Sequence, residues 1–317
     1  MSRLFAAALV LLLPGCGQLL SLKDELQVYD ATVATVGGTL RFDACQDCTL
    51  LLVSLDGEGH TLSFKVFDGA GPFEALVHRS ARSVFAFHDA NGNLQYDAEE
   101  PFAWHPLPAG PARDPLRLQL RPAADQAAPP MRPQGSLFAA RDRLIGGVPT
   151  QLGTVAGLDD PRFDREKARE GMWKPVSFMR EGLAGIYFQQ PYAADRTPVL
   201  LVHGMGGSPR DFDALVRGLD RSRFQPWFFY YPSGLDLDVV GTGLLAMLNQ
   251  LWLERRFTGL HVVAHSMGGL VVRSFLQDCR DAGECRYVRN FVSISSPFGG
   301  AAAAQPRRRK ALTIPPW

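Results

Sequence analysis

The stretch Val262-Val263-Ala264-His265-Ser266-Met267-Gly268-Gly269 joins an apolar run to a serine and two glycines. The pattern predicts a strand that ends in a sharp turn, with a helix starting directly after the serine. Small residues on both sides, Ala264 and Gly268, let neighbouring segments pass close to this turn. The hydroxyl would then lie beside the Met267 N–H at a helix start, where negative charge is stabilised. Ser266 is therefore the predicted nucleophile; the alternative is an ordinary turn with a capping serine.

A second glycine-rich turn lies upstream, at Val202-His203-Gly204-Met205-Gly206-Gly207, after another apolar run. Two such turns in this order resemble the α/β-hydrolase family, and within it the bacterial lipases and esterases whose first elbow glycine is alanine. The resemblance implies a doubly wound, mostly parallel α/β sheet. It also implies cleavage of carboxylic esters, including lipid esters, through an acyl-enzyme on Ser266 with no cofactor required. The backbone N–H groups of Met205 and Met267 would form the oxyanion hole, and the His203 side chain would be structural.

The base that such a serine needs is missing from its usual place. In this family a carboxylate and then a histidine follow the serine, whereas all seven histidines of this chain precede Ser266. The adjacent His265 is expected to point away from the turn tip, and Asp278 and Asp281 come too early for the family's acid. We therefore expect weak or no activity, because loss of the base leaves only binding and oxyanion contributions.

The end of the sequence loses the pattern of the preceding residues. Beyond residue 300 come an alanine run and the basic cluster Arg307-Arg308-Arg309-Lys310. This indicates a hydrolase domain that is incomplete at its C-terminus; the alternative is a genuinely short protein whose basic tail contacts anionic lipid.

Two other classes of function stay open, namely a non-catalytic binding module of the cell envelope and an acyltransferase.

The N-terminus predicts export. Arg3 precedes an apolar run over residues 4–13, which is too short to cross a membrane and is typical of a secretory signal. Leu13-Pro14-Gly15-Cys16 resembles the lipobox of bacterial lipoproteins. This implies a signal peptide over residues 1–15, a lipid anchor on Cys16 and an outer-membrane location facing the periplasm. A plain secretory signal with a chance cysteine is the alternative.

The four other cysteines predict two local disulfides, because an even cysteine count in an exported chain favours pairing. Cys279 pairs with Cys285 after the elbow helix, and Cys45 pairs with Cys48 across a turn. A redox role for the Cys45–Cys48 pair is the first alternative, although no helix with an apolar face follows it. A zinc site made of all four thiols is the second.

Residues 16–120 predict a β-sandwich, because their apolar residues alternate with a period of two between turns rich in Gly, Asp and Asn. About seven short strands are expected, with six readable ranges at residues 28–36, 50–55, 61–66, 73–77, 83–87 and 116–120. Residues 121–134 contain four prolines and predict a Pro/Ala linker between two domains.

One loop of this sandwich carries oxygen ligands at the spacing of a calcium loop. They are Asp89, Asn91, Asn93, Asp97 and Glu100. The loop resembles the calcium-holding turns of bacterial surface β-sandwich modules of the adhesin type, and the resemblance implies a structural Ca²⁺. A polar hairpin turn without metal is the alternative, since Asp, Asn and Gly favour turns by themselves.

Residues 135–317 are the predicted α/β-hydrolase domain, in which strands and helices alternate. Strands are expected at residues 183–187, 199–202, 224–231, 260–264 and 288–294, and helices at 162–171, 208–219, 237–253 and from 267 onward. Residues 172–175 and 178–179 are candidates for the lining of an acyl pocket or for a lid; the alternative, more typical for such apolar residues, is that they belong to the core. The net charge of +1 gives no basic surplus for a nucleic-acid partner.

Overall fold

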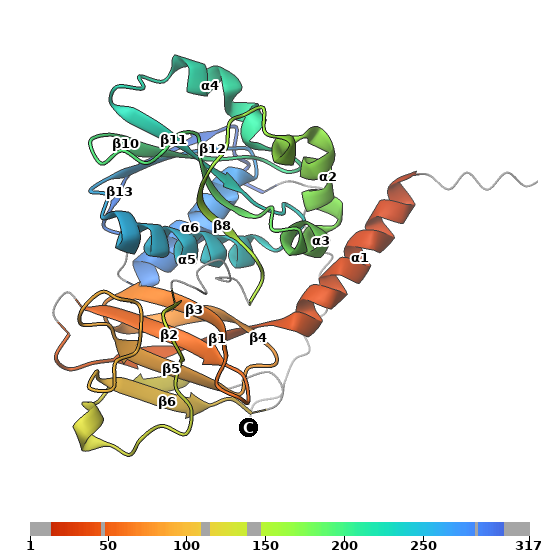
Figure 1. The fold of residues 1–317 in the computed structure, drawn as a ribbon. Helices are drawn as coiled ribbons and strands as arrows, with labels where there is room; N and C mark the ends of the chain where they lie inside the picture. Colours follow the sequence, from red (N-terminus) through yellow and green to blue (C-terminus); the bar gives the residue numbers. More distant parts are fainter. Residues whose placement is uncertain (1–13, 46–47, 109–114, 138–146, 283–284, 301–317) are drawn as a thin grey trace, which may run out of the picture.

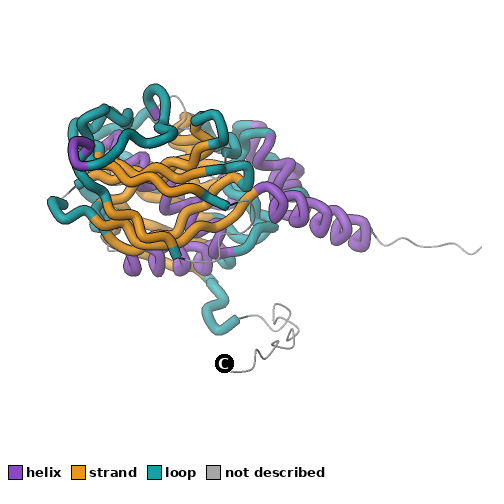
Figure 2. The backbone as a smooth tube through the Cα atoms, turned by 90° about the horizontal axis from the view of Figure 1, so that it is seen from below, coloured by secondary structure: helices purple, strands orange, loops and turns teal. Residues whose placement is uncertain are grey.

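The computed structural model describes residues 14–45, 48–108, 115–137, 147–282 and 285–300. Its first element, α1 (Pro14–Thr32), projects away from the rest of the molecule at its N-terminal end (Figures 1 and 2). Further along its length, α1 contacts α2 (Arg165–Trp173) and α3 (Pro175–Arg180). Glu25 fastens this contact, because its carboxylate accepts hydrogen bonds from the Ser177 N–H and hydroxyl at 2.8 and 2.7 Å. Because the Val176 N–H also donates to this carboxylate at 2.7 Å, two otherwise unpaired N–H groups at the start of α3 are satisfied.

Seven strands follow α1 and form two sheets, with strand orders β4-β1-β7 and β3-β2-β5-β6. All pairs are antiparallel except β1 with β7, which is parallel. The strands are β1 (Val33–Arg41), β2 (Thr49–Leu55), β3 (Thr61–Asp68), β4 (Gly71–His78), β5 (Ser83–His88), β6 (Phe102–Pro106) and β7 (Leu116–Gln119).

Both faces of the four-stranded sheet are buried, which explains why β2 is apolar at consecutive positions. Leu50 and Leu52 point into the core that this sheet shares with the three-stranded sheet. Leu51 and Val53 point the other way, into a larger cluster that also contains residues of the C-terminal half such as Leu251. This cluster joins residues on both sides of the segment that was expected to be a linker.

The C-terminal half contains a six-stranded sheet of order β13-β12-β10-β11-β9-β8. It is mostly parallel, as expected, and only the β9–β11 pair is antiparallel. Its strands are β8 (Gln151–Val155), β9 (Gly185–Phe188), β10 (Thr197–Val202), β11 (Phe224–Tyr230), β12 (Leu260–His265) and β13 (Val288–Ile294). Consecutive parallel strands are joined by helices, as in other α/β proteins.

Two long helices, α5 (Leu237–Arg255) and α6 (Gly268–Ala282), lie between the six-stranded sheet and the two N-terminal sheets (Figure 1). The opposite face of the six-stranded sheet carries the short helices η4 (Pro209–Phe212) and α4 (Asp213–Gly218). A 3-10 helix, η3 (Pro161–Phe163), precedes α2. Helices therefore cover both faces of this sheet, which buries parallel strands such as β10 completely.

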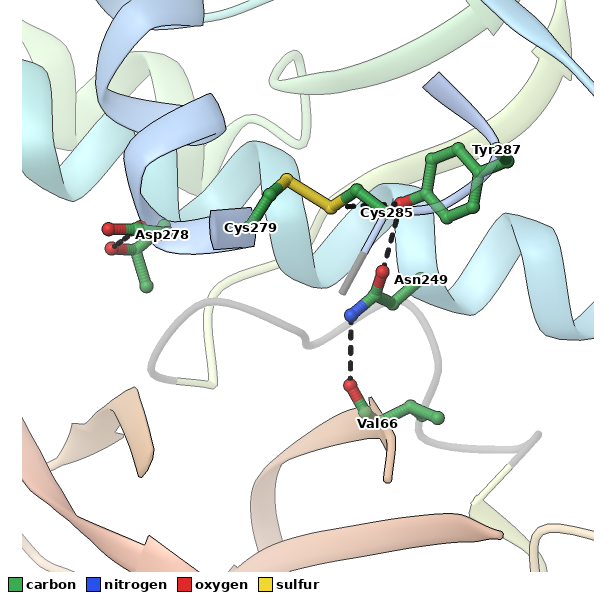
Figure 3. The surroundings of a disulfide bond; sticks show 7 residues. Val66, Asn249, Asp278, Cys279, Cys285 and Tyr287 are labelled. Carbon is green, nitrogen blue, oxygen red and sulfur yellow. Dashed lines mark hydrogen bonds between the residues drawn. A yellow bond between two sulfur atoms is a disulfide. The ribbon is translucent and has the colours of Figure 1, made fainter. Parts of the chain in front are cut away.

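A chain of hydrogen bonds connects these layers beside one disulfide (Figure 3). The Tyr287 hydroxyl donates to the Asn249 side-chain oxygen at 2.9 Å, and the Asn249 amide donates to the Val66 carbonyl of β3 at 3.2 Å. Asn249 lies on α5 and is 4% exposed, so both ends of its amide are satisfied inside the protein. The Cys279–Cys285 disulfide lies next to Tyr287 and closes the segment after α6.

Both predicted disulfides are confirmed, Cys45–Cys48 and Cys279–Cys285. The N-terminal secondary structure differs from the prediction in two places. Residues 28–32 are the last turn of α1, and the strand begins only at Val33. Buried Tyr29 packs into the large apolar cluster from this helix, so tertiary packing overrides the strand-like pattern. Strand β6 was not among the ranges readable from the sequence.

Strand β13 forms the edge of the six-stranded sheet, and most of its residues are exposed. Val292 and Ile294 are 52% and 41% exposed although both are apolar, because no further element packs on them within the described part of the chain.

None of the helices in the described ranges is long and apolar enough to cross a membrane.

Candidate active site

Ser266 occupies the tip of a strained turn between β12 and α6. Its φ of 53° lies in the left-handed region that non-glycine residues rarely adopt. The Ser266 N–H donates to the Ile294 carbonyl at 2.8 Å, which ties the turn to the neighbouring strand. Helix α6 starts two residues later, at Gly268. The predicted strand, sharp turn and helix are thus all present, with the serine partly exposed at the corner.

Small residues let the two glycine-containing turns fit together. A Cβ atom on Gly268 would collide with the His203 carbonyl, and a Cβ atom on Gly204 would lie 3.0 Å from the Ser266 Cβ. The turn after β10 therefore lies directly against the turn after β12. Both turns come after neighbouring parallel strands, whose carboxyl ends meet at one edge of the sheet.

Two backbone N–H groups beside the serine have no acceptor in the part of the chain that the structure describes. Among the described residues, neither the Met205 N–H nor the Met267 N–H donates a hydrogen bond. Met267 directly precedes the first residue of α6, where the partial positive charge of a helix N-terminus favours an anion. Met205 lies in the glycine turn, and its side chain is 59% exposed. Two free donors on adjoining turns could stabilise an oxyanion.

His203 is a structural part of the glycine turn. The residue is 1% exposed, and its ring stacks on Tyr231 with centroids 4.2 Å apart. The Tyr231 N–H donates to His203 Nε2 at 3.3 Å, so the ring proton sits on Nδ1 and is donated to the Gly204 carbonyl at 2.8 Å. Burial lowers the pKa of His203 to about 4, which keeps the ring neutral.

No histidine in the described ranges forms a hydrogen bond with the Ser266 hydroxyl. His261 Nδ1 is hydrogen-bonded to the Asn290 amide at 2.9 Å. The His265 ring is exposed, and its Nδ1 would lie 3.4 Å from a Cβ atom on Gly204, but no hydrogen bond joins it to the serine. The four remaining histidines belong to the N-terminal sheets.

The described acidic residues that follow Ser266 in the sequence accept hydrogen bonds from other residues and not from the serine or a histidine. The Asp278 carboxylate accepts a hydrogen bond from the Thr242 hydroxyl of α5 at 2.9 Å, and burial raises its pKa. Asp281 accepts hydrogen bonds from the Gln277 amide of the same helix. Glu284 lies outside the described residues. The catalytic base and acid are therefore not assigned to any described residue.

Two residues from distant parts of the sequence hold the glycine turn; Met172 was among the predicted lid or core residues, whereas Ser233 had no recognised functional signal. The Ser233 hydroxyl accepts a hydrogen bond from the Gly206 N–H at 2.8 Å and so holds the glycine turn from the end of β11. Met172 at the end of α2 covers the same turn, since its sulfur would lie 3.4 Å from a Cβ atom on Gly206. Neither contact follows a local spacing rule, because the partners are far apart in the sequence.

The expected lid residues belong mostly to the core. Phe178 and Met179 are buried, with 0% and 2% exposure. Met179 also lines an apolar cavity of about 20 Å³ beside Tyr231 and Pro232, next to the glycine turn. A cavity of this size holds no more than about one water molecule. An acyl chain could enter here only if these side chains moved.

The predicted calcium loop is closed by its own hydrogen bonds. Asp89 accepts from the N–H groups of Gly92, Asn93 and Leu94, and Glu100 accepts from those of Ala90 and Asp97. The side-chain amides of Asn91 and Asn93 both donate to Asp97. The described residues contain no group of three or more acidic, histidine or cysteine side chains that could hold a metal ion. The hydrogen bonds are those of a polar turn, and the structural Ca²⁺ stays a prediction.

The predictions for the N-terminus are only partly covered by the structure. Residues 1–13 of the expected signal peptide lie outside the described residues. Cys16 lies in the first turn of α1, and its side chain is likewise outside what the structure describes. The lipid anchor therefore stays a prediction.

Comparisons with known proteins point to a related chemistry. The model of the palmitoyl protein thioesterase family matches residues 239–313, a range that includes Ser266. Lysosomal thioesterase PPT2-B of Xenopus laevis is 28% identical over 131 residues, which are 37% of this chain and 41% of the relative. The chain thus spans about two fifths of the curated relative it matches. Both matches support a hydrolase of the thioesterase or esterase type, and neither singles out the bacterial lipases.

Proposed function

We propose that this chain is a serine hydrolase of acyl thioesters and esters, with fatty-acyl groups as the substrate class and Ser266 as the nucleophile. The observation that carries the proposal is the position of Ser266, with φ at 53°, next to two N–H groups that have no acceptor among the described residues. The similarity to palmitoyl protein thioesterases supports a thioester substrate.

The proposal includes the placement of the protein and its domains. In it, residues 135–317 form an α/β-hydrolase domain that follows a β-sandwich of residues 16–120, with residues 121–134 between them. Cys16 carries the lipid anchor, which holds the protein at the outer membrane near acylated substrates. The order of strands β12, β10 and β11 and the two adjoining turns support the domain assignment.

The reaction begins when Ser266 Oγ attacks the acyl carbonyl carbon. The carbonyl oxygen becomes negative and accepts hydrogen bonds from the Met205 and Met267 N–H groups. The C–S bond then breaks, the thiolate leaves with the bonding electrons, and the Oγ proton reaches it through water. Water next cleaves the acyl-serine and releases the fatty acid. Both steps are slow here, because no described histidine is hydrogen-bonded to Ser266 to act as the base.

Thiol release from a palmitoyl thioester tests the proposal. We expect weak turnover that Ser266→Ala abolishes, with its pH profile rising as hydroxide replaces the missing base. After the rate without protein is subtracted, added imidazole, a soluble base, should raise the rate of the unmodified chain and leave that of Ser266→Ala unchanged. Equal rates for the two proteins with and without imidazole would contradict the assignment and favour the non-catalytic alternative.

A further inference from the structure

We propose that the groove between α1 and α2, together with the protruding end of α1, binds the surface of a membrane that contains anionic phospholipid. The groove has a volume of about 710 Å³. It is lined by the first turns of α1 and by one side of α2, and the residues used below are Gln18, Ser21, Arg165, Arg169, Trp173 and Lys174.

Three cations of this groove have no carboxylate partner. Arg165, Arg169 and Lys174 are exposed, and none forms a salt bridge with another described residue. One of the two acids in the groove, Glu170, is already paired with Lys167 at 2.9 Å. The groove therefore keeps positive charges that an anionic headgroup can neutralise.

The order of residues on α2 places two of these charges, Arg165 and Arg169, in one row with Trp173. Arg165, Arg169 and Trp173 follow one another at intervals of four residues, so they share one side of the helix. Like charges four residues apart destabilise a helix, and a cation at the first helical residue opposes the helix dipole. The two arginines therefore destabilise α2 when it is isolated, and an anionic partner would reduce the repulsion between their charges.

Apolar residues beside the charges favour a lipid surface over a free phosphate ion. Leu19 and Leu20 on the protruding end of α1 are 59% and 63% exposed. Trp173, which is half-buried, lines the groove next to the cations. Exposed leucine, tryptophan and arginine side chains are the composition of segments that lie at a membrane interface. Gln18 and Ser21 add polar groups that can contact headgroups.

The surface lies close to the candidate active site. Trp173 directly follows Met172, which covers the glycine turn. Binding at the groove would therefore bring the bilayer near Ser266. The inference does not depend on catalysis, because membrane binding needs neither the serine nor a base.

Sedimentation of the full-length Cys16→Ser chain, which cannot be acylated at this position, with lipid vesicles tests the proposal. One set is pure phosphatidylcholine, and in the other a third of the lipid is phosphatidylglycerol. The apolar N-terminus can bind both sets, so the ratio of the two partition coefficients isolates the charge effect. We expect a preference for the anionic vesicles, and the triple variant R165E/R169E/K174E should lower that ratio by at least about tenfold. Salt should weaken the preference as well.

A matched control reverses three exposed arginines of the N-terminal sheets, in the variant R41E/R117E/R121E. It makes the same change in net charge and should retain most of the preference. Thermal melting of each variant checks that the fold is intact. Equal binding of the unmodified chain to both vesicle sets would overturn the proposal, as would an equal loss in the groove variant and the control.

Discussion

A Cβ atom on Gly204 would lie 3.0 Å from the Cβ of Ser266, so the glycine turn and the serine turn are in contact. Gly204→Ala forces the two turns apart. We expect a loss of about 1 to 3 kcal/mol in the free energy of unfolding, as for other overpacked sites. Urea unfolding measures it. Gly218→Ala is the control, because an added Cβ there meets nothing within 4 Å; equal effects of the two substitutions would refute the close approach.

The left-handed backbone of Ser266 predicts an unusual response to glycine. Ser266→Gly and Ser266→Ala both remove the hydroxyl, but only glycine adopts a φ of 53° without strain. Ser266→Gly should therefore be more stable than Ser266→Ala by about 1 kcal/mol. Chemical unfolding of the two variants gives the difference directly, and a less stable glycine variant would show that the turn is not strained.

The buried His203 ring predicts a loss of stability in mild acid. Its pKa is about 4 in the folded chain and takes its ordinary value of 6.5 on unfolding. The unfolded chain therefore binds the extra proton, and the free energy of unfolding falls as the pH drops from about 6.5 to 4, by about 3 kcal/mol in all. Stability at each pH is measured for the unmodified chain and for His203→Gln, which cannot titrate. Parallel pH profiles of the two proteins would contradict this account.

The hydrogen bonds in Figure 3 predict energetic coupling between Asn249 and Tyr287. Asn249→Ala removes a buried amide that also bonds to the Val66 carbonyl, and it should cost about 2 kcal/mol. Tyr287→Phe should cost about 1 kcal/mol. The double variant should lose less than the sum, because the shared bond is removed only once. Strict additivity in this double-mutant cycle would rule out the link.

The C-terminal half was largely predictable, because its signals are local. The apolar run into Ser266 and the helix expected at residues 208–219 correspond to observed elements, and a capping box at Ser208 starts the second of them. Strand β8 was missed because Gly153 interrupts it. Gly153 has φ at 76°, and the register shifts on passing from Leu152 to Thr154. A strand with such a bulge shows no clean alternation.

Long-range contacts explain what the sequence could not show. Nothing in the sequence distinguishes Glu25 from other charged residues, yet its carboxylate accepts a hydrogen bond from Ser177 at the start of α3. Ser233 reads as a turn residue, yet its hydroxyl fixes the Gly206 N–H. The tertiary fold brings these partners together, and no regular spacing in the sequence predicts them. The composition of the Asp89 loop predicts a cation site, whereas the backbone N–H groups that donate to its carboxylate oxygens could not be read from the sequence.

The central claim is that Ser266 accepts an acyl group, and trapping the acyl-enzyme tests it most directly. Without a base to activate water, the acyl-serine should persist. The chain is incubated with a palmitoyl thioester in the absence of imidazole, digested with trypsin and analysed by mass spectrometry. The account predicts one palmitoyl adduct on the peptide of residues 257–273, which contains Ser266 and no cysteine, and none there in Ser266→Ala. An unmodified peptide in the original chain, or an adduct that survives Ser266→Ala, would contradict it.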